Sequence, residues 1–130
     1  ERLTPQNAAE RIAAYDIVVD GTDNAAVRYL ISDVCQALRK PYVYGAICGF
    51  EGQVAVLCAG HATYRTLYPQ DDAPASALPV VKGVVGPTPG TVGSVEAAQA
   101  IQLLCGMGSP LIDRLWTIDL RTMQSFVIDL

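Results

Sequence analysis

A strand, a helix and a second strand follow one another between residues 15 and 48, and this unit constrains the fold more than any other feature. Residues 15–20 (YDIVVD) form a short segment that contains three consecutive β-branched apolar side chains and ends at Gly21, which is typical of a buried strand. Apolar residues then recur between residues 27 and 38 at helical spacing, which predicts one face of an amphipathic helix. A second apolar run covers residues 42–48. This order predicts two parallel strands joined by a right-handed crossover.

The later part of the chain predicts antiparallel strands. A strand expected at residues 53–58 follows closely on the previous one, with Glu51-Gly52 as a tight turn, so the two should pair antiparallel. Residues 60–82 are rich in proline and are expected to form a long loop. The other expected elements are helices over residues 7–14 and 91–105 and strands over residues 115–120 and 125–130. We predict an α/β fold whose mixed sheet has a parallel half followed by an antiparallel meander.

Charge and hydropathy exclude two classes of partner. Lys and Arg number 9 and Asp and Glu number 13, so the formal net charge is −4. Binding to nucleic acid needs a surplus of cations to neutralise phosphates, and we expect no such partner. Hydrophobic residues make up 51% of the chain, but no apolar stretch reaches the ~18 residues of a membrane span, so no membrane partner is expected either.

The four cysteines do not form a recognisable framework. They lie at positions 35, 48, 58 and 105, and no two of them form a Cys-x-x-Cys pair. Three lie in apolar runs, where a free cysteine behaves as a small hydrophobic residue. We therefore expect buried, reduced thiols and a cytoplasmic location.

The turn after the first predicted strand carries the candidate site. Ligands on parallel sheets bind at the carboxyl ends of the strands, where Asp20 and Asp23 flank Gly21. A carboxylate near a helix N-terminus could hold Mg²⁺ against a phosphate. The alternative is that Thr22 or Asp23 simply caps the helix, which we expect to begin there and to end before Pro41. Neither a Gly-x-Gly-x-x-Gly nor a Gly-Lys-Ser/Thr loop occurs, so this chain alone does not supply a complete nucleotide site.

Several linked motifs resemble a known family. They are residues 15–24 (YDIVVDGTDN), 28–31 (RYLI), 41–46 (PYVYGA), 50–54 (FEGQV), 83–87 (GVVGP) and 90–104. In this order they are similar to the second half of the ThiF/MoeB adenylyltransferase domain. This Rossmann-like fold is the catalytic fold of ubiquitin-activating enzymes and their sulfur-carrier relatives.

The resemblance implies a definite reaction. Such enzymes bind MgATP and a ubiquitin-like or sulfur-carrier protein ending in Gly-Gly, join AMP to its terminal carboxylate and release pyrophosphate. By the same resemblance, Asp23 holds Mg²⁺ or the ATP phosphates and is the catalytic residue. Asn24 lies at the nucleotide, and Arg28 steadies the acyl-phosphate region. The family also implies a homodimer.

Two departures from the family pattern argue against a zinc site and against a thioester step. Thr63 and Thr66 stand where sulfur-carrier members often have two cysteines of a zinc site, so we expect no structural zinc. The stretch that matches the family's catalytic cysteine, residues 78–82, contains no cysteine. Adenylation does not need that cysteine, so an adenylating step is favoured over a thioester step.

The resemblance also sets the expected domain organisation. We expect residues 1–130 to be the C-terminal part of one adenylation domain, with the nucleotide-loop half missing, and to be inactive alone. An alternative is a catalytically degenerate copy that binds a partner without adenylating it. An NAD-linked dehydrogenase would use a similar sheet, but nothing in the sequence supplies its acid or base.

Overall fold

The computed structural model describes residues 1–69 and 83–130. The element order is α1 (Ala8–Ala13), β1 (Val18–Val19), α2 (Ala25–Leu38), β2 (Tyr42–Cys48), β3 (Glu51–Leu57), α3 (Tyr64–Leu67), α4 (Pro87–Cys105), β4 (Arg114–Asp119) and β5 (Gln124–Asp129). The predicted loop over residues 60–82 contains the short helix α3, and its part from residue 70 lies outside the described residues.

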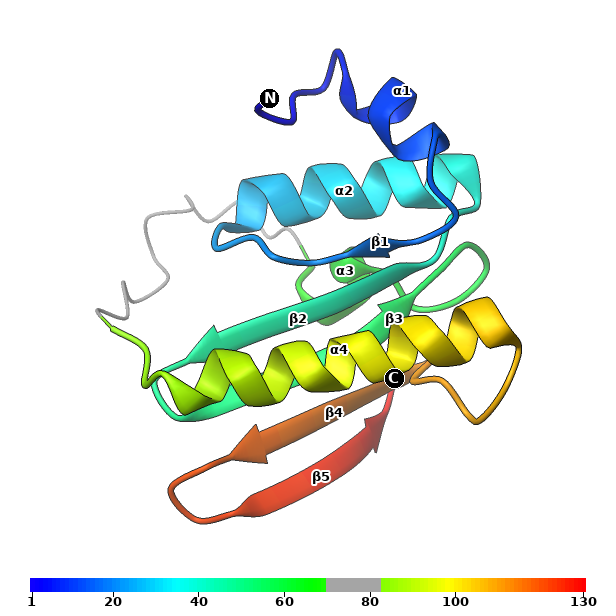
Figure 1. Ribbon diagram of the computed structural model, residues 1–130. Coiled ribbons are helices and arrows are strands. Elements are labelled where there is room, and N and C mark those ends of the chain that lie inside the picture. The colour runs from blue at the N-terminus through cyan, green and yellow to red at the C-terminus, as the bar shows by residue number, and fades with distance from the viewer. Residues whose placement is uncertain (70–82) are drawn as a thin grey trace.

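The strands form one five-stranded sheet in the order β1-β2-β3-β4-β5 (Figure 1). β1 and β2 pair in parallel, and each later neighbour pairs antiparallel. The predicted mixed sheet, with its parallel half followed by an antiparallel meander, is therefore confirmed.

Two hydrophobic cores lie on opposite faces of the sheet. On one face, Tyr42 and Tyr44 of β2 pack with α1, α2 and α3 around Ile31 and Tyr64. On the other face, the buried core consists of Val43, Val54, Val56, Val92 and Leu111. Because successive side chains of a strand point to opposite faces, β2 contributes to both cores and sits between the helical layers.

The glycines of the central strands bring α4 unusually close to the sheet. A Cβ atom on Gly52 would lie 2.3 Å from Cγ2 of Val92, and one on Gly45 would lie 2.4 Å from Cδ of Glu96. Val92 and Glu96 are one turn apart on α4, so the helix rests on β2 and β3 at two positions that have no side chain. Figure 1 shows α4 crossing this face of the sheet.

Several predicted element ends were wrong. β1 is only two residues long, Val18–Val19, rather than six. The turn between β2 and β3 is Gly49-Phe50, not Glu51-Gly52, because Glu51 already pairs with Cys48 in the ladder. Gly49 has a φ of +59°, a conformation that glycine adopts at little cost.

α4 begins earlier than predicted. Its first residue is Pro87 rather than residue 91, and it ends as expected at Cys105 with Gly106 in the left-handed conformation. Proline is favourable at the first helical position, where its missing N–H would have no helical partner. The cluster of glycines and prolines before residue 91 therefore includes the first helical turn.

The cysteines are less buried than expected. All four are free, but only Cys35 is buried, while Cys48 and Cys105 are exposed. Among residues 1–69 and 83–130, no helix is long and apolar enough to cross a membrane.

Candidate functional site

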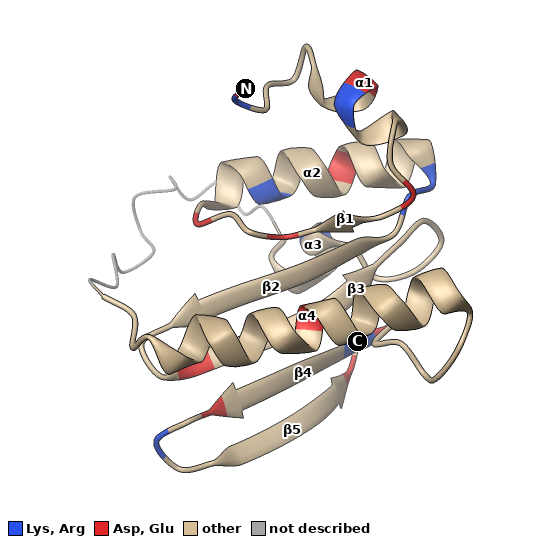
Figure 2. Cartoon of the chain, in the orientation of Figure 1, with Lys and Arg blue, Asp and Glu red and all other residues tan. Residues whose placement is uncertain are grey.

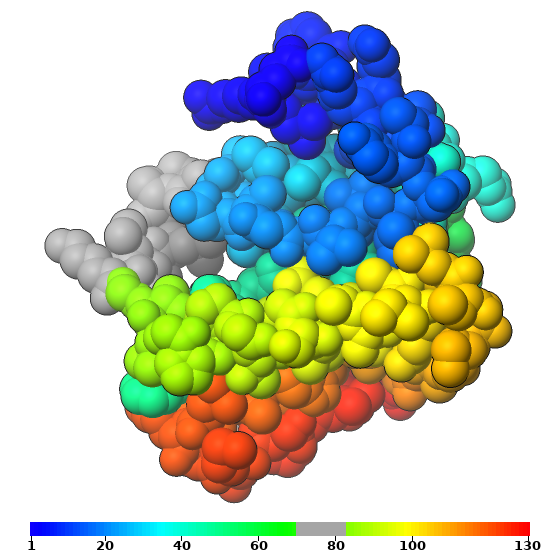
Figure 3. Space-filling model, viewed as in Figure 1, coloured from blue at the N-terminus to red at the C-terminus, as the bar shows by residue number. Residues whose placement is uncertain are grey.

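A groove of about 660 Å³ opens where β1 ends, between the turn before α2 and the first half of α4. Its walls are residues 20–23, Arg28, residues 45–47 of β2, and α4 residues that include Val92, Gly93 and Glu96. In Figure 3 the blue segment around residue 20 and the yellow-green start of α4 border this groove. The groove lies at the carboxyl end of the parallel strands, as predicted from the strand–helix–strand order.

Asp20 is the buried anchor of the turn. Its side chain is 0% exposed, and Oδ1 accepts hydrogen bonds from the backbone N–H of Thr22 at 2.8 Å and from its hydroxyl at 2.7 Å. Oδ2 accepts from Nε of Arg28 at 3.1 Å and from the hydroxyl of Tyr42 at 2.8 Å. Burial, together with the nearby Asp20 carboxylate, raises the pKa of Tyr42, which keeps this hydroxyl protonated as a donor. All four contacts hold Asp20 as a structural carboxylate.

Arg28 joins three elements at the floor of the groove. Besides Asp20, it donates from Nη2 to the carbonyl oxygen of Thr22 at 2.6 Å and to that of Gly45 at 3.3 Å. Its guanidinium also lies over the ring of Tyr44, with Cζ 5.6 Å from the centroid. The arginine thus fixes the turn, α2 and β2 relative to one another and brings a positive charge to the groove.

The cap of α2 is Asn24, which corrects the predicted start near Thr22 or Asp23. The helix begins at Ala25, and Oδ1 of Asn24 accepts a hydrogen bond from the backbone N–H of Val27 at 3.0 Å. Asn24 has the extended backbone typical of an N-cap residue. Asn24 itself is not among the residues that line the groove.

Asp23 is left without a structural task. It is exposed, it lines the groove, and its carboxylate has no hydrogen-bond or ion-pair partner within residues 1–69 and 83–130. The alternative interpretation that Asp23 is merely the helix cap is therefore wrong. Of the predicted site residues, the structure brings Asp23 and Arg28 into one groove and sets Asn24 beside it.

Glu96 is a groove residue that the sequence reasoning missed. It is the only charged residue of α4, drawn red on that helix in Figure 2, and it is 6% exposed. Its Oε1 is buried and has no hydrogen-bond partner among the described residues. Burial and the charge of Asp20 raise its pKa to about 7, opposed by the charge of Arg28. Its spacing of four residues from Val92 puts it on the same face of the helix, but this spacing alone does not indicate a site residue.

The two threonines at the zinc-cysteine positions form the cap of α3. Thr63 accepts a hydrogen bond from the backbone N–H of Thr66 at 3.3 Å, and the Thr66 hydroxyl accepts from the backbone N–H of Thr63 at 3.0 Å. This reciprocal capping box satisfies donors at the helix start. Two further bonds tie α3 to α2: the backbone N–H of Tyr64 donates to Ser32, and Arg65 pairs with Asp33.

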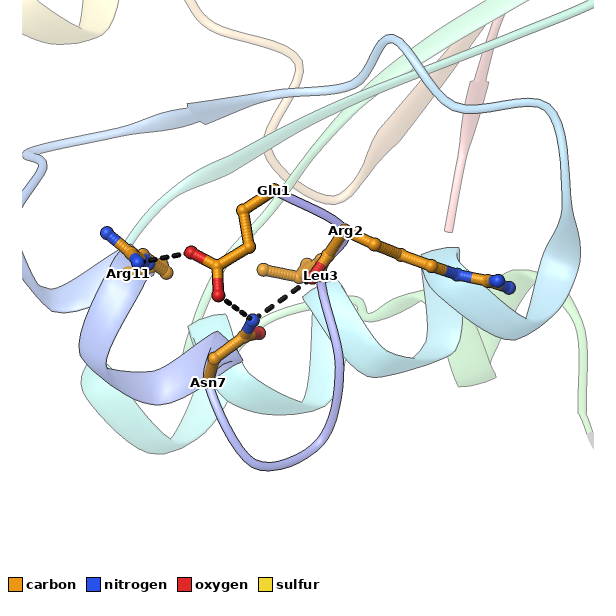
Figure 4. Close-up of a pocket in the computed structure, with 5 residues that line it drawn as sticks. All are labelled: Glu1, Arg2, Leu3, Asn7 and Arg11. Atoms are coloured by element: carbon orange, nitrogen blue, oxygen red, sulfur yellow. Dashed lines mark hydrogen bonds and ion pairs between the residues drawn. The ribbon is translucent and has the colours of Figure 1, made fainter.

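A second hollow, of about 220 Å³, lies at the N-terminus (Figure 4). Its polar groups bond to one another: Asn7 donates to Glu1 and to the carbonyl oxygen of Arg2, and Arg11 pairs with Glu1. These contacts are local and exposed. The groove at the end of β1 is therefore the candidate site.

Comparison with known proteins agrees with the fold. The family description "ThiF family" matches residues 1–130. The sulfur carrier protein adenylyltransferase of Thermus thermophilus is 42% identical over an alignment of 127 positions, which covers 91% of this chain and 46% of that protein. The SAMP-activating enzyme E1 of Haloferax volcanii is 40% identical over 123 residues, which are 94% of this chain and 46% of that enzyme. The chain thus spans less than half the length of these relatives.

Solved structures with the same fold are more distant in sequence. The crystal structure of E. coli MccB aligns with a TM-score of 0.78 at 12% identity, covering 99% of this chain and 40% of that one. The structure of PaaA aligns with a TM-score of 0.73 at 10% identity, covering 98% of this chain and 46% of that one. At these identities the likeness concerns the fold alone.

Proposed function

Because the chain belongs to the ThiF family, we propose that it takes part in the ATP-dependent adenylation of the C-terminal Gly-Gly of a ubiquitin-like or sulfur-carrier protein. One observation carries the proposal: the carboxylate of Asp23 has no hydrogen-bond or ion-pair partner among the described residues, and Asp23 lines a groove at the carboxyl end of the parallel strands. Curated relatives that activate such carriers, at about 40% identity, support the class of substrate.

The donor set of the turn fits MgATP. Magnesium favours one or two carboxylates together with phosphate oxygens, and Asp23 offers one carboxylate that is not bonded to any other described residue. On this proposal Asp23 would hold Mg²⁺ or the phosphates, and the bound metal would neutralise charge on the phosphates as the adenylyl group is transferred. Asn24, one residue further, would lie at the nucleotide while its Oδ1 caps α2.

The chemistry needs positioning and charge stabilisation rather than a protein nucleophile. The terminal carboxylate of the carrier attacks the α-phosphorus of ATP, a carboxyl–phosphate bond forms, and the bond to pyrophosphate breaks. Arg28 is held rigidly by Asp20 and two backbone carbonyls, so its charge would meet the acyl-phosphate region without rearrangement. Gly21 and Gly93 in the walls leave space for a tail that has no side chains, because a Cβ at either position would meet nothing within 4 Å.

The proposal extends to the organisation of the protein. Residues 1–130 would form the C-terminal part of the adenylation domain, and the nucleotide loop would belong to another segment. This part alone would be inactive, and the whole protein would act as a cytoplasmic homodimer. A structural zinc would be absent, because Thr63 and Thr66 cap α3 instead of offering thiolates.

A catalytically degenerate, partner-binding copy remains the second candidate. It is favoured by the threonines at the zinc positions and by the absence of a cysteine in residues 78–82. The unpaired Asp23 favours the enzyme, since a copy that no longer bound nucleotide would have no use for an isolated carboxylate in the groove.

ATP–pyrophosphate exchange distinguishes the two candidates. The full-length protein should exchange pyrophosphate into ATP when a cognate Gly-Gly carrier protein is added, and Asp23→Ala should abolish this exchange. Asp16→Ala is the matched control, because Asp16 is equally exposed but lies outside the groove. If no candidate carrier stimulates exchange by the wild-type protein, the degenerate copy is correct. If Asp23→Ala exchanges like the wild type, the role given to Asp23 is wrong.

A further inference from the structure

Glu96 is a buried carboxyl group that nothing in its surroundings explains. Only 6% of the residue is exposed, and the carboxyl lies directly over Gly45, where a Cβ would come within 2.7 Å of each of its three terminal atoms. Its Oε1 has no hydrogen-bond partner among the described residues. Burying a polar group without a partner is costly, and such groups are rare in folded proteins.

The charged neighbours of Glu96 do not supply the missing partner. Asp20 at the end of β1 repels it and already accepts four hydrogen bonds. Arg28 on α2 attracts it, but Nε and Nη2 of Arg28 are bonded to Asp20, Thr22 and Gly45. Asp23 is the other acidic residue in the same groove. Because Glu96 lines the groove, a ligand bound there would supply the partner that its carboxyl group lacks.

We propose that Glu96 binds the C-terminal tail of the carrier protein: its protonated carboxyl group donates a hydrogen bond to a backbone carbonyl oxygen of the tail. This inference rests on the function proposed above. The tail suits this position because Gly21 and Gly93 in the groove walls have no side chains and a Cβ at either would meet nothing within 4 Å, so a peptide backbone can approach closely. In this role Glu96 contacts the ligand from the α4 wall of the groove, whereas Asp23 lies in the wall formed by the turn before α2.

Charge decides in favour of the protonated form. The tail ends in a carboxylate and ATP is strongly anionic, while the described residues that line the groove include Asp20 and Asp23 and only one cation, Arg28. A second buried anion beside these ligands would repel them. The pKa of Glu96 is about 7 before any ligand arrives, since burial and Asp20 both raise it, so a proton is available near neutral pH.

The pH dependence of exchange tests this inference. In the wild-type full-length protein, kcat/KM for the carrier should fall about fivefold between pH 7 and pH 8, as the protonated fraction falls. Glu96→Gln keeps an N–H donor that does not titrate, so its kcat/KM should not show this fall. Glu96→Leu should raise KM for the carrier at every pH and leave kcat at saturation nearly unchanged. Glu51→Gln, an exposed residue outside the groove, should behave as the wild type.

Proton uptake on carrier binding is a second measurement that does not depend on activity. It is obtained by calorimetry of carrier binding in two buffers of different ionisation enthalpy. At pH 8 the wild type should take up a proton on binding, and Glu96→Gln should take up none. If exchange proceeds but the wild type and Glu96→Gln share one pH profile and one proton uptake, the inference is overturned and the proposed function stands. If the carrier binds but no exchange occurs, the proposed adenylation is wrong, and the proton uptake alone tests the role of Glu96. If no carrier binds, both proposals are overturned.

Discussion

Nε of Arg28 lies 3.1 Å from Oδ2 of Asp20, and this ion pair fixes the end of β1 against α2. The side chains are 14% and 0% exposed, so the pair is shielded from solvent. Removing one partner of a buried pair leaves the other charge buried without compensation, which typically costs 3–5 kcal/mol. Because Asp20 keeps its bonds to Thr22 and Tyr42, we expect the lower end of that range here.

Arg28→Met should therefore lower the free energy of unfolding by about 3 kcal/mol, measured by urea denaturation. Arg11→Met is the matched control, since it removes the ion pair with Glu1, whose side chains are 57% and 60% exposed. Exposed pairs contribute at most about 1 kcal/mol, so the control should change little. Equal losses in the two variants would contradict a structural role for the buried pair.

Substitutions at Asp23 and at Asn24 should have different effects on the free energy of unfolding. Asn24→Ala removes the acceptor for the backbone N–H of Val27 and should lower the free energy of unfolding by about 1 kcal/mol. Asp23→Ala removes no hydrogen bond and should change stability by less than about 0.5 kcal/mol. If Asp23→Ala were the more damaging of the two, the cap would be wrongly assigned.

Periodicity and strand composition were sufficient to predict the sheet. The apolar spacing of α2 and the apolar run of β2 each reflect burial on a fixed face, and both elements lie where they were expected. The cap was harder to predict, because Thr22, Asp23 and Asn24 are adjacent and all cap helices well. The choice depends on Asp20, which bonds to Thr22 and directs the turn so that the helix starts one residue later.

Glu96 could not have been assigned to the site from the sequence. A single glutamate in a helix is usually exposed, and the burial of Glu96 depends on a residue far away in the chain. Gly45 leaves a gap in the face of β2, and the carboxyl of Glu96 on α4 fills that gap. Tertiary packing, rather than local pattern, therefore creates this part of the groove.

Stability should depend on pH through Glu96. Its pKa in the folded protein is about 7, above the ordinary 4.5, so folding favours the protonated form. This contribution is fully present below pH 4.5 and is lost as pH rises through 7. At pH 8 the buried charged carboxylate lowers the free energy of unfolding by on the order of 3 kcal/mol. Glu96→Gln carries no charge and avoids this loss. The variant should therefore have a higher Tm than the wild type at pH 8 and nearly the same Tm at pH 4.5. A Tm difference that did not vary with pH would contradict burial of this carboxyl.

The segment around α3 should not need a metal for its stability. Its capping box and its bonds to Ser32 and Asp33 supply the anchoring that two thiolates would share with a zinc ion elsewhere in the family. A chelator should leave the Tm unchanged, and Thr63→Ala should lower the free energy of unfolding by about 1 kcal/mol. Stoichiometric zinc in the purified protein, lost together with stability on chelation, would contradict this prediction.

The close contact of α4 with β2 should appear as coupling between Gly45 and Glu96. Gly45→Ala places a Cβ 2.4 Å from Cδ of Glu96, so the side chain or the helix must shift, at a cost of about 1–3 kcal/mol. Glu96→Ala removes the obstructing carboxyl, and in that background Gly45→Ala should cost much less. The expected coupling energy, from urea denaturation of the four proteins in the double-mutant cycle, is at least about 1 kcal/mol. Gly21→Ala is the control, because a Cβ there meets nothing within 4 Å. Additive effects at Gly45 and Glu96 would show that the carboxyl does not rest on the strand.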